Sequence, residues 1–439
     1  MGILAVVVLG ACVPSAPPPP SLPGLGSACT AREPSVPSSV SNTGPVPDTP
    51  LGDDALSPGA AAELIREDVA SNQTRTADGS IPLVLVEEVD GEPEITTATA
   101  SSTQDAGTIA ADAAESAELV SVEVDSVATT ATDDFFSPEQ WSFDHTTFES
   151  AWATSTGADT LVAVIDTGVQ MDHPDLRDQV VTGRQFLYAE GLRSGRRFDG
   201  VDANGHGTHV AGIVGAATNN DRGVAGTAPD TKIQPLRTLE ACGGGWMSDV
   251  ALAIDYARRS GADVINLSLG SFENSPAVAL EIQQAVAEGV IVVASAGNDG
   301  RDWNRPSYPA ALPQSVSVAA VRDVGAQVAH ADYSTSGAYV DVAAPGSGVC
   351  STWPTQKTFN QGGCRPGVTA RYRYLNGTSM AAPHVSGVAA LLKGVRSGCT
   401  ATDFLDLVDS SSDLIPGTTA PQVGAGLVDP AEILTTATC

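Results

Sequence analysis

The feature that most constrains the fold is an alternation of apolar segments after residue 140. Short strand-like runs rich in Val, Ile and Ala alternate there with helix-like stretches. These segments span residues 160–165, 210–217, 232–236, 250–257, 264–269, 278–287, 290–294, 316–321, 339–342 and 385–392. Short buried strands between helices predict an open, mostly parallel sheet covered on both faces. Ligands bind such sheets at the carboxyl ends of the strands, so the chemistry is expected there.

The first third of the chain differs from the rest in charge. Residues 1–140 contain 22 acidic and 3 basic side chains, whereas residues 141–439 contain 30 and 19. The net charge of −30 argues against nucleic acid and anionic membrane surfaces as partners, because both would repel the chain. No apolar run reaches the length of a membrane-spanning helix, so the sequence does not predict an integral membrane protein.

The N-terminal region divides into three segments. Residues 1–12 end in Leu9-Gly10-Ala11-Cys12, which resembles a bacterial lipobox in which Cys12 is lipidated, although the usual preceding Lys or Arg is missing. A random apolar N-terminus is the alternative. Residues 13–58 are rich in Pro, Ser and Gly and predict an extended linker. Helix-like stretches at 59–70 and 104–118 and strand-like runs at 81–89 and 119–124 predict a small acidic α+β unit.

Seven cysteines suit an exported protein. We expect two disulfides, each closing one segment of the C-terminal part. They pair Cys350 with Cys364 and Cys399 with Cys439. Cys29 and Cys242 have no obvious partner, and the sequence leaves their pairing open.

Three short blocks carry side chains suited to nucleophilic catalysis. Residues 161–168 (LVAVIDTG) end a buried strand with Asp166, and residues 204–212 (NGHGTHVAG) place His206 at the start of a small-residue helix. Residues 376–384 (NGTSMAAPH) place Ser379 after a tight turn, at the start of another helix. A serine hydroxyl needs a base to become a nucleophile, and histidine has a pKa near the working pH. A carboxylate then fixes the histidine tautomer and stabilises the imidazolium.

In the chain order Asp, His, Ser, the three blocks resemble the signatures of the subtilisin-like serine proteases, the subtilases of peptidase family S8. The resemblance covers about residues 135–439. It implies an α/β, three-layer subtilisin-like fold with a mostly parallel central sheet, preceded by a small α+β prosegment. It also implies a secreted serine endopeptidase that works through an acyl-enzyme, with Asp166 as orienting acid, His206 as general base and Ser379 as nucleophile.

The same resemblance implies an oxyanion hole and a substrate cleft. Residues 290–298 match the family segment whose Asn lines the oxyanion hole, so Asn298 and the backbone N–H of Ser379 become the expected donors. Two walls would hold an extended polypeptide as an added strand. These walls are Gly243, Gly244 and Gly245 on one side and Ser268, Leu269 and Gly270 on the other. Ala296 and Gly297 are small enough to leave an S1 pocket open, and nothing indicates cleavage after paired basic residues.

A structural, non-catalytic Ca²⁺ site is also implied. Asp175 matches a calcium ligand of the family, and the loop 217–223 resembles its calcium loop, with Asn219 and Asp221 as ligands. Asp133 would add a third group. Hard oxygen ligands from several loops suit Ca²⁺, and a plain polar turn is the alternative.

Residues 59–130 match the place of an N-terminal prosegment that chaperones folding and inhibits the active site until it is cleaved. We expect self-cleavage between about Asp125 and Asp134, which would release residues 135–439 as the peptidase domain. A lipid on Cys12 would then hold only the prosegment at a bacterial membrane. The mature protease is expected to be extracellular and monomeric, and its partners are polypeptide substrates and its own prosegment.

Three other functions compete with this interpretation. An aspartic protease using Asp166 would need two such loops or a dimer, and it would leave the His and Ser blocks unexplained. An esterase of the α/β-hydrolase type would need a Gly-x-Ser-x-Gly turn, which is missing around Ser379. A non-catalytic binding protein on the same fold is the alternative from a different class, and retention of all four blocks argues against it.

Overall fold

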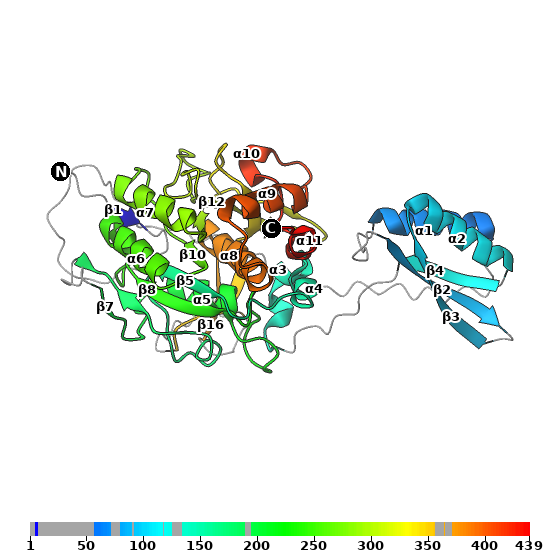
Figure 1. Ribbon diagram of the computed structural model, residues 1–439, viewed down its shortest axis with the longest axis horizontal. Coiled ribbons are helices and arrows are strands. Elements are labelled where there is room, and N and C mark those ends of the chain that lie inside the picture. The colour runs from blue at the N-terminus through cyan, green and yellow to red at the C-terminus, as the bar shows by residue number, and fades with distance from the viewer. Residues whose placement is uncertain are drawn as a thin grey trace. The chain divides into compact units, whose positions relative to one another are not determined.

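A computed structural model describes residues 5–7, 57–71, 80–89, 92–116, 118–124, 134–188, 195–355, 364 and 371–439. The chain forms two compact units (Figure 1), of which residues 28–130 make the smaller and the remaining residues the larger. The predictions for Cys12, for nearly all of the 13–58 linker and for the cleavage region concern residues outside those described. Among the described residues, no helix has both the length and the apolarity that crossing a bilayer requires.

The larger unit is built on a mostly parallel sheet. Within the described residues it has nine strands in the order β13-β12-β11-β10-β5-β8-β6-β7, with β14 also paired with β12. The parallel strands are β5 (Leu161–Asp166), β6 (Arg184–Gln185), β8 (Lys232–Arg237), β10 (Val264–Leu267), β11 (Ile291–Ser295), β12 (Val316–Asp323) and β14 (Val342–Pro345). At the edges, β7 (Arg196–Arg197) and β13 (Val328–His330) pair antiparallel.

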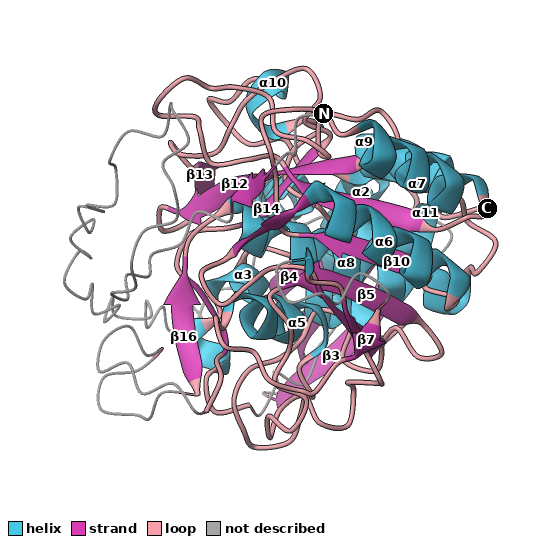
Figure 2. Ribbon diagram, turned by 90° about the vertical axis from the view of Figure 1, so that its left-hand side faces the viewer, coloured by secondary structure: helices cyan, strands magenta, loops and turns pink. Residues whose placement is uncertain are grey.

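Helices cover both faces of this sheet. On one face lie α6 (Met247–Arg259) and α7 (Pro276–Ala287); on the other lie α5 (His206–Gly215), α8 (Thr378–Val395), α9 (Ala401–Ser411) and α11 (Pro430–Thr436). Val162 and Val164 share a core with α5 and α8, whereas Ala163 and Ile165 share one with α6 and α7. Successive strand residues point to opposite faces, so burial on both faces requires the continuous apolar runs of the sequence. The predicted three-layer α/β fold is confirmed (Figure 2).

Shorter elements complete the larger unit. They are β1 (Ala5–Val7), the 3-10 turn η1 (Ser137–Glu139), α3 (Trp141–Asp144), α4 (Phe148–Trp152), β9 (Gly244–Trp246), β15 (Val349–Thr352), β16 (Tyr372–Leu375) and α10 (Ala420–Val423). The strands β15 and β16 form a hairpin, and β1 pairs antiparallel with β9. Both expected disulfides, Cys350–Cys364 and Cys399–Cys439, are present. Cys242 is a free, exposed cysteine.

The smaller unit is an α+β fold, as predicted. It contains α1 (Pro58–Ser71), β2 (Ile81–Val89), β3 (Glu92–Ala100), α2 (Thr103–Ser116) and β4 (Glu118–Val124), with an antiparallel sheet in the order β3-β2-β4. Its core includes Ile65, Leu83, Leu85 and Leu119. The strand β3 was not predicted, because its sequence EPEITTATA lacks the apolar run that marked the other strands.

Candidate active site

The first two catalytic candidates meet at the carboxyl end of β5. Asp166 is the last residue of β5 and is fully buried, and His206 is the first residue of α5. The Nδ1 atom of His206 lies 2.8 Å from Asp166 Oδ1 and 2.9 Å from Oδ2. Burial lowers the pKa of His206, whereas the charge and hydrogen bond of Asp166 and the charge of Asp202 raise it, and the net shift is upward. With Nδ1 held by the carboxylate, Nε2 is the nitrogen left to exchange a proton.

Ser379 lies over the end of the neighbouring strand. It is the second residue of α8, and two hydrogen bonds tie it to Ser268, which directly follows β10. The Oγ of Ser268 donates to the carbonyl oxygen of Ser379 (2.8 Å), and the Oγ of Ser379 donates to the carbonyl oxygen of Ser268 (3.3 Å). The Ser379 hydroxyl thus bonds to Ser268 rather than to His206. Hydrogen bonds between catalytic groups are often long without substrate and tighten in the complex.

Asn298 follows β11, the next strand of the sheet. Its Oδ1 accepts hydrogen bonds from the N–H (2.9 Å) and the hydroxyl (3.0 Å) of Thr378. These two bonds orient the amide, so its NH₂ group is left to donate elsewhere. A Cβ added to Gly377 would lie 3.5 Å from Asn298 Nδ2 and 3.6 Å from the backbone N of Ser379. The missing side chain of Gly377 therefore leaves a space flanked by both expected oxyanion donors.

The expected first wall of the cleft carries an added strand. Gly244 and Gly245 belong to β9, and Gly243 belongs to the turn before it. Residues Ala5–Val7 pair antiparallel with this strand, with Val6 opposite Gly245 and Val7 opposite Gly244. The edge of β9 thus accepts an extended segment through main-chain pairing, which is the geometry expected for a peptide.

Ser307, which the sequence motifs did not indicate, packs against Gly270 of the second expected wall and against Gly297. Ser307 is buried, and a Cβ added to Gly270 would collide with its hydroxyl. A Cβ added to Gly297 would lie 2.9 Å from the Cβ of Ser307. Gly270 and Gly297 are therefore required for close packing against Ser307. Ala296 is fully buried, and its carbonyl oxygen accepts a hydrogen bond from Tyr339 (2.8 Å).

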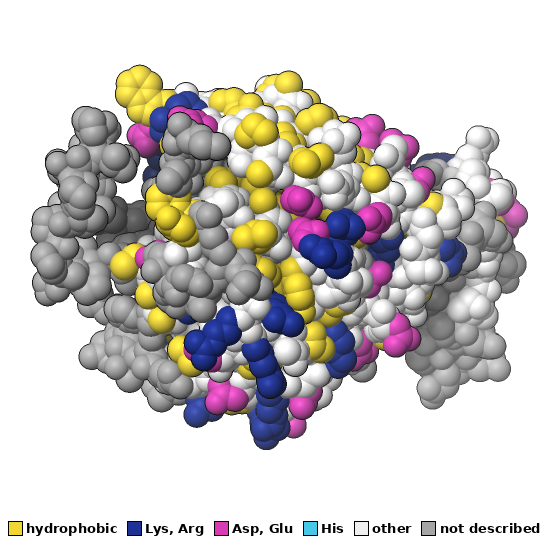
Figure 3. Space-filling model, turned by 60° about the vertical axis from the view of Figure 1, so that its left-hand side comes forward, with side chains coloured by type: hydrophobic (Ala, Val, Ile, Leu, Met, Phe, Trp, Pro, Cys, Tyr) yellow, Lys and Arg dark blue, Asp and Glu magenta, His cyan; other side chains and the backbone are white. Residues whose placement is uncertain are grey.

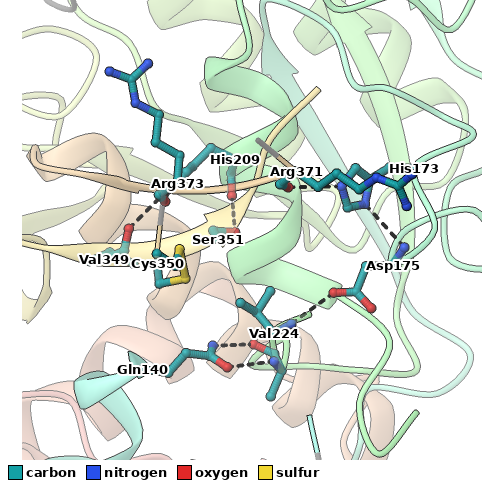
Figure 4. The surroundings of a disulfide bond; sticks show 12 residues. Gln140, His173, Asp175, His209, Val224, Val349, Cys350, Ser351, Arg371 and Arg373 are labelled. Atoms are coloured by element: carbon teal, nitrogen blue, oxygen red, sulfur yellow. Dashed lines mark hydrogen bonds between the residues drawn. A yellow bond between two sulfur atoms is a disulfide. The ribbon is translucent and has the colours of Figure 1, made fainter. Parts of the chain in front are cut away.

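Asp175, a predicted calcium ligand, is fully buried, and Figure 4 shows its carboxylate facing the backbone of Val224. Its oxygens accept hydrogen bonds from Asn220 Nδ2 and from the N–H of Val224, and each of these bonds is 3.0 Å long. Burial raises the pKa of Asp175 to about 7, although these two bonds oppose the shift; the charge of Asp134 adds to it. Without a metal ion, the protonated form of Asp175 is therefore favoured up to about pH 7.

The other predicted calcium ligands are Asn219, Asp221 and Asp133, and the two that the structure describes are not buried as Asp175 is. Asn219 and Asp221 are exposed and have positive φ values of 57° and 59°. Asp133 lies outside the described residues, but the next residue, Asp134, is buried and accepts the N–H groups of Asn219 (3.1 Å) and Asn220 (3.2 Å). The Oδ1 of Asn220 is buried and has no hydrogen-bond partner within the described part of the chain. Across the described residues, no group of three or more His, Cys, Asp and Glu side chains is gathered as metal ligands.

Two further histidines, His209 and His384, are packed inside the fold. The Nε2 of His209 lies 2.8 Å from the carbonyl oxygen of Arg373, and burial lowers its pKa to about 3. The Nδ1 of His384 lies 2.8 Å from the carbonyl oxygen of Met380, and burial lowers its pKa to about 4. Both rings therefore stay neutral near neutral pH.

Comparison with known proteins gives consistent matches for the larger unit. Residues 157–426 match the model of the subtilase family, peptidase S8. Thermitase of Thermoactinomyces vulgaris is 38% identical over 289 residues, which are 66% of this chain and 94% of thermitase. An extracellular protease of Xanthomonas campestris is 37% identical over 350 residues, covering 70% of this chain and 58% of that protein. Among solved structures, a protease of Pseudoalteromonas arctica aligns with a TM-score of 0.60 and 34% identity, covering 70% of this chain and 99% of that one.

Proposed function

The chain belongs to the subtilase family and is a serine endopeptidase, and from that premise we propose that it cleaves peptide bonds with Asp166, His206 and Ser379. The observation that carries the proposal is the contact of His206 Nδ1 with both carboxylate oxygens of Asp166 at the end of β5. Ser379 is hydrogen-bonded at the end of β10, the neighbouring strand. This arrangement leaves His206 Nε2 as the base.

In the proposed reaction, the Oγ of Ser379 attacks the carbonyl carbon of the substrate while His206 Nε2 takes its proton. The imidazolium that forms is stabilised by Asp166 and later protonates the leaving amine. The oxyanion accepts hydrogen bonds from Asn298 Nδ2 and from the N–H of Ser379, and the space beside Gly377 supports this assignment. Water then hydrolyses the acyl-enzyme by the same route.

We propose that the substrate is a polypeptide bound as an extended strand between Gly243–Gly245 and Ser268–Gly270. The antiparallel pairing of Ala5–Val7 with β9 supports this, because that pairing uses the same main-chain edge. Ala296 and Gly297 would line the S1 pocket, and Ser307 packs against Gly297. We expect the mature enzyme to act as a monomer.

Residues 59–130 are proposed to be an inhibitory prosegment that the enzyme removes itself. The compact α+β unit ending at β4 supports this, because it is separate from the peptidase unit. The two disulfides support export to an oxidising compartment. If Cys12 carries a lipid, cleavage between 125 and 134 would release the protease from the membrane.

We also propose a structural Ca²⁺ site around Asp175. The chemistry of the residues fits: a buried carboxylate, the nearby carboxylate of Asp134 and the buried Oδ1 of Asn220 are all hard oxygen donors. Asn219, Asp221 and Asp133 remain proposed contributors from the adjoining loop and N-terminus. The ion would neutralise the buried charge and would take no part in catalysis.

The deciding experiment compares the intact mass of wild type with that of Ser379→Ala, both expressed for export. We expect wild type to begin between residues 125 and 134 and the variant to stay full length. Identical trimming of both would mean that another protease matures the chain. Absence of trimming in both, together with no reaction with a serine-directed fluorophosphonate, would favour a non-catalytic binding protein.

A further inference from the structure

A second buried carboxylate lies beside the proposed triad. Asp202 is in the loop before α5, and its side chain is 4% exposed. Its two oxygens accept five hydrogen bonds of 2.7–3.0 Å. The donors are Thr167 Oγ1, the N–H groups of Asn204, Gly205 and Thr208, and Thr208 Oγ1. A charge removed from water needs this degree of compensation, so the loop is built around the ionised form of Asp202.

The two hydroxyls donate to Asp202 and do not accept from it. Thr167 Oγ1 already accepts the N–H of Gly207 (2.9 Å), and Thr208 Oγ1 accepts the N–H of Gln170 (3.0 Å). Each hydroxyl has a single hydrogen, and geometry directs it to the carboxylate. Burial raises the pKa of Asp202 and the nearby charge of Asp166 adds to this shift, whereas the hydrogen bonds from Gly205 and Thr208 oppose it; the net shift is upward.

These bonds join the segment of the acid to the segment of the base. Thr167 directly follows Asp166, and Gly207 directly follows His206. The path from Gly207 N–H through Thr167 Oγ1 to Asp202 therefore links the end of β5 to the first turn of α5. Asp202 also accepts the N–H of Thr208, so a negative charge lies at the positive end of α5.

We propose that Asp202 is a positioning residue that holds His206 in the orientation for proton transfer and stabilises its protonated form. The inference rests on the proposed roles of Asp166, His206 and Ser379. Asp202 acts through Thr167 and the start of α5 and does not touch the reacting atoms. The titratable groups that act on His206 are Asp166 and Asp202, which both favour the imidazolium, and the buried neutral His209.

The test compares Asp202→Asn with Asp199→Asn in peptide hydrolysis measured across pH. Asp199 is in the same loop segment, but it is exposed, so the control removes the same charge where water screens it. For Asp202→Asn we expect kcat to fall about 10- to 100-fold with little change in KM. Losing a nearby anion destabilises the imidazolium, so the acidic limb of kcat/KM should also move to lower pH. Asp199→Asn should change neither quantity.

A second pair of variants keeps the test decisive if Asp202→Asn folds poorly. Thr167→Val removes the hydroxyl that connects Asp202 with Gly207, whereas Thr167→Ser keeps it. We expect Thr167→Val to lose kcat and Thr167→Ser to retain most of it, at equal folded fraction by circular dichroism. If the wild type is active and Asp202→Asn has the same kcat and the same acidic limb of kcat/KM as the wild type, the inference is overturned. An inactive wild type would reject the proposed function, and this inference with it.

Discussion

At the residue scale, the site depends on how burial and neighbouring charges set the protonation of His206. Its side chain is 11% exposed, and this burial by itself would disfavour the charged form. The carboxylates of Asp166 and Asp202 together outweigh this effect, and the pKa of His206 is raised. A base of raised pKa takes a proton from serine more readily, but only above the pH at which it is itself deprotonated.

The pH dependence of activity and the Asp166→Asn variant test this balance. Because the neutral imidazole is the active form, kcat/KM should rise with pH through a pKa above the ordinary histidine value of 6.5. In Asp166→Asn we expect that pKa to fall and kcat to drop about 10⁴-fold, since the tautomer is no longer fixed. A profile with the same acidic limb in both proteins would contradict this assignment.

Asn298 gives a second prediction at this scale. Replacing it with Ala removes one oxyanion donor, and we expect kcat to fall about 10²–10³-fold while KM stays nearly constant. Asn304 is exposed and, among the described residues, its side chain bonds only to Ser336, so it supplies a matched amide control. Steady-state kinetics of Asn298→Ala and Asn304→Ala would measure the difference. A loss that appeared mainly in KM would indicate a role in substrate binding instead.

At the scale of the element, the start of α8 determines where the nucleophile lies. Gly377 precedes the helix with φ of 153°, a conformation that residues with a side chain rarely adopt. Two hydrogen bonds from Thr378 to Asn298 and two between Ser379 and Ser268 then join this first turn to the ends of β11 and β10. The position of Ser379 is therefore set by contacts with two strands rather than by the helix alone.

The variant Gly377→Ala tests this role of the helix start. Its Cβ would enter the space between Asn298 Nδ2 and the N–H of Ser379, so we expect a large loss of kcat as well as some loss of stability. Gly398→Ala is the control, because an added Cβ there meets nothing within 4 Å. Turnover and thermal melting of both variants would be compared. Full activity of Gly377→Ala would mean that the oxyanion does not bind in this space.

The loop that follows α5 gives a prediction about metal removal. The pKa of Asp175 is about 7 in the fold against 3.8 for the ordinary group, so in calcium-free protein the folded state holds a proton that the unfolded state loses. Calcium-free protein should therefore lose stability as pH rises from about 4 to about 7, and added Ca²⁺ should restore it. Melting temperatures across this range, with and without chelator, measure the effect. In Asp175→Asn, both the pH dependence and the Ca²⁺ response should diminish.

At the scale of the whole molecule, the net charge of −30 opposes compaction. Positive side chains are nonetheless paired locally: Arg258 contacts Asp255 and Glu288, and Arg259 contacts Asp255. On one face of the molecule, Figure 3 shows Lys and Arg side chains lying beside Asp and Glu. Such exposed pairs contribute little each, so the excess of acidic groups dominates the long-range field.

Added salt should therefore stabilise the full chain. Raising the salt concentration from about 0.01 M to about 1 M shortens the screening length from roughly 30 Å to roughly 3 Å. We expect the melting temperature to rise with NaCl, because the repulsion among acidic groups weakens more than the few local ion pairs do. A melting temperature that fell steadily with NaCl would show that ion pairs outweigh the repulsion.

The sequence alone predicted those features that depend on residues close together in the chain. The apolar runs predicted the sheet and its two helical layers, because burial on both faces imposes that pattern on each strand separately. The blocks around Asp166, His206, Ser379 and Asn298 were recognisable because the local turn and the functional side chain lie within a few residues of each other. The strand β3 was missed because pairing with β2, rather than its own Thr-rich sequence, makes it a strand.

Only the tertiary structure decided which residues from different loops meet. Ser307 packs against Gly270 and Gly297, Asp134 bonds to the loop that contains Asn220, and Asp202 binds the hydroxyl of Thr167. No periodicity marks such residues, because their partners come from other segments and the contact exists only after the strands align. The physical reason is that secondary structure depends on the burial pattern of neighbouring residues, whereas a site depends on hydrogen bonds and packing between residues from different segments of the chain.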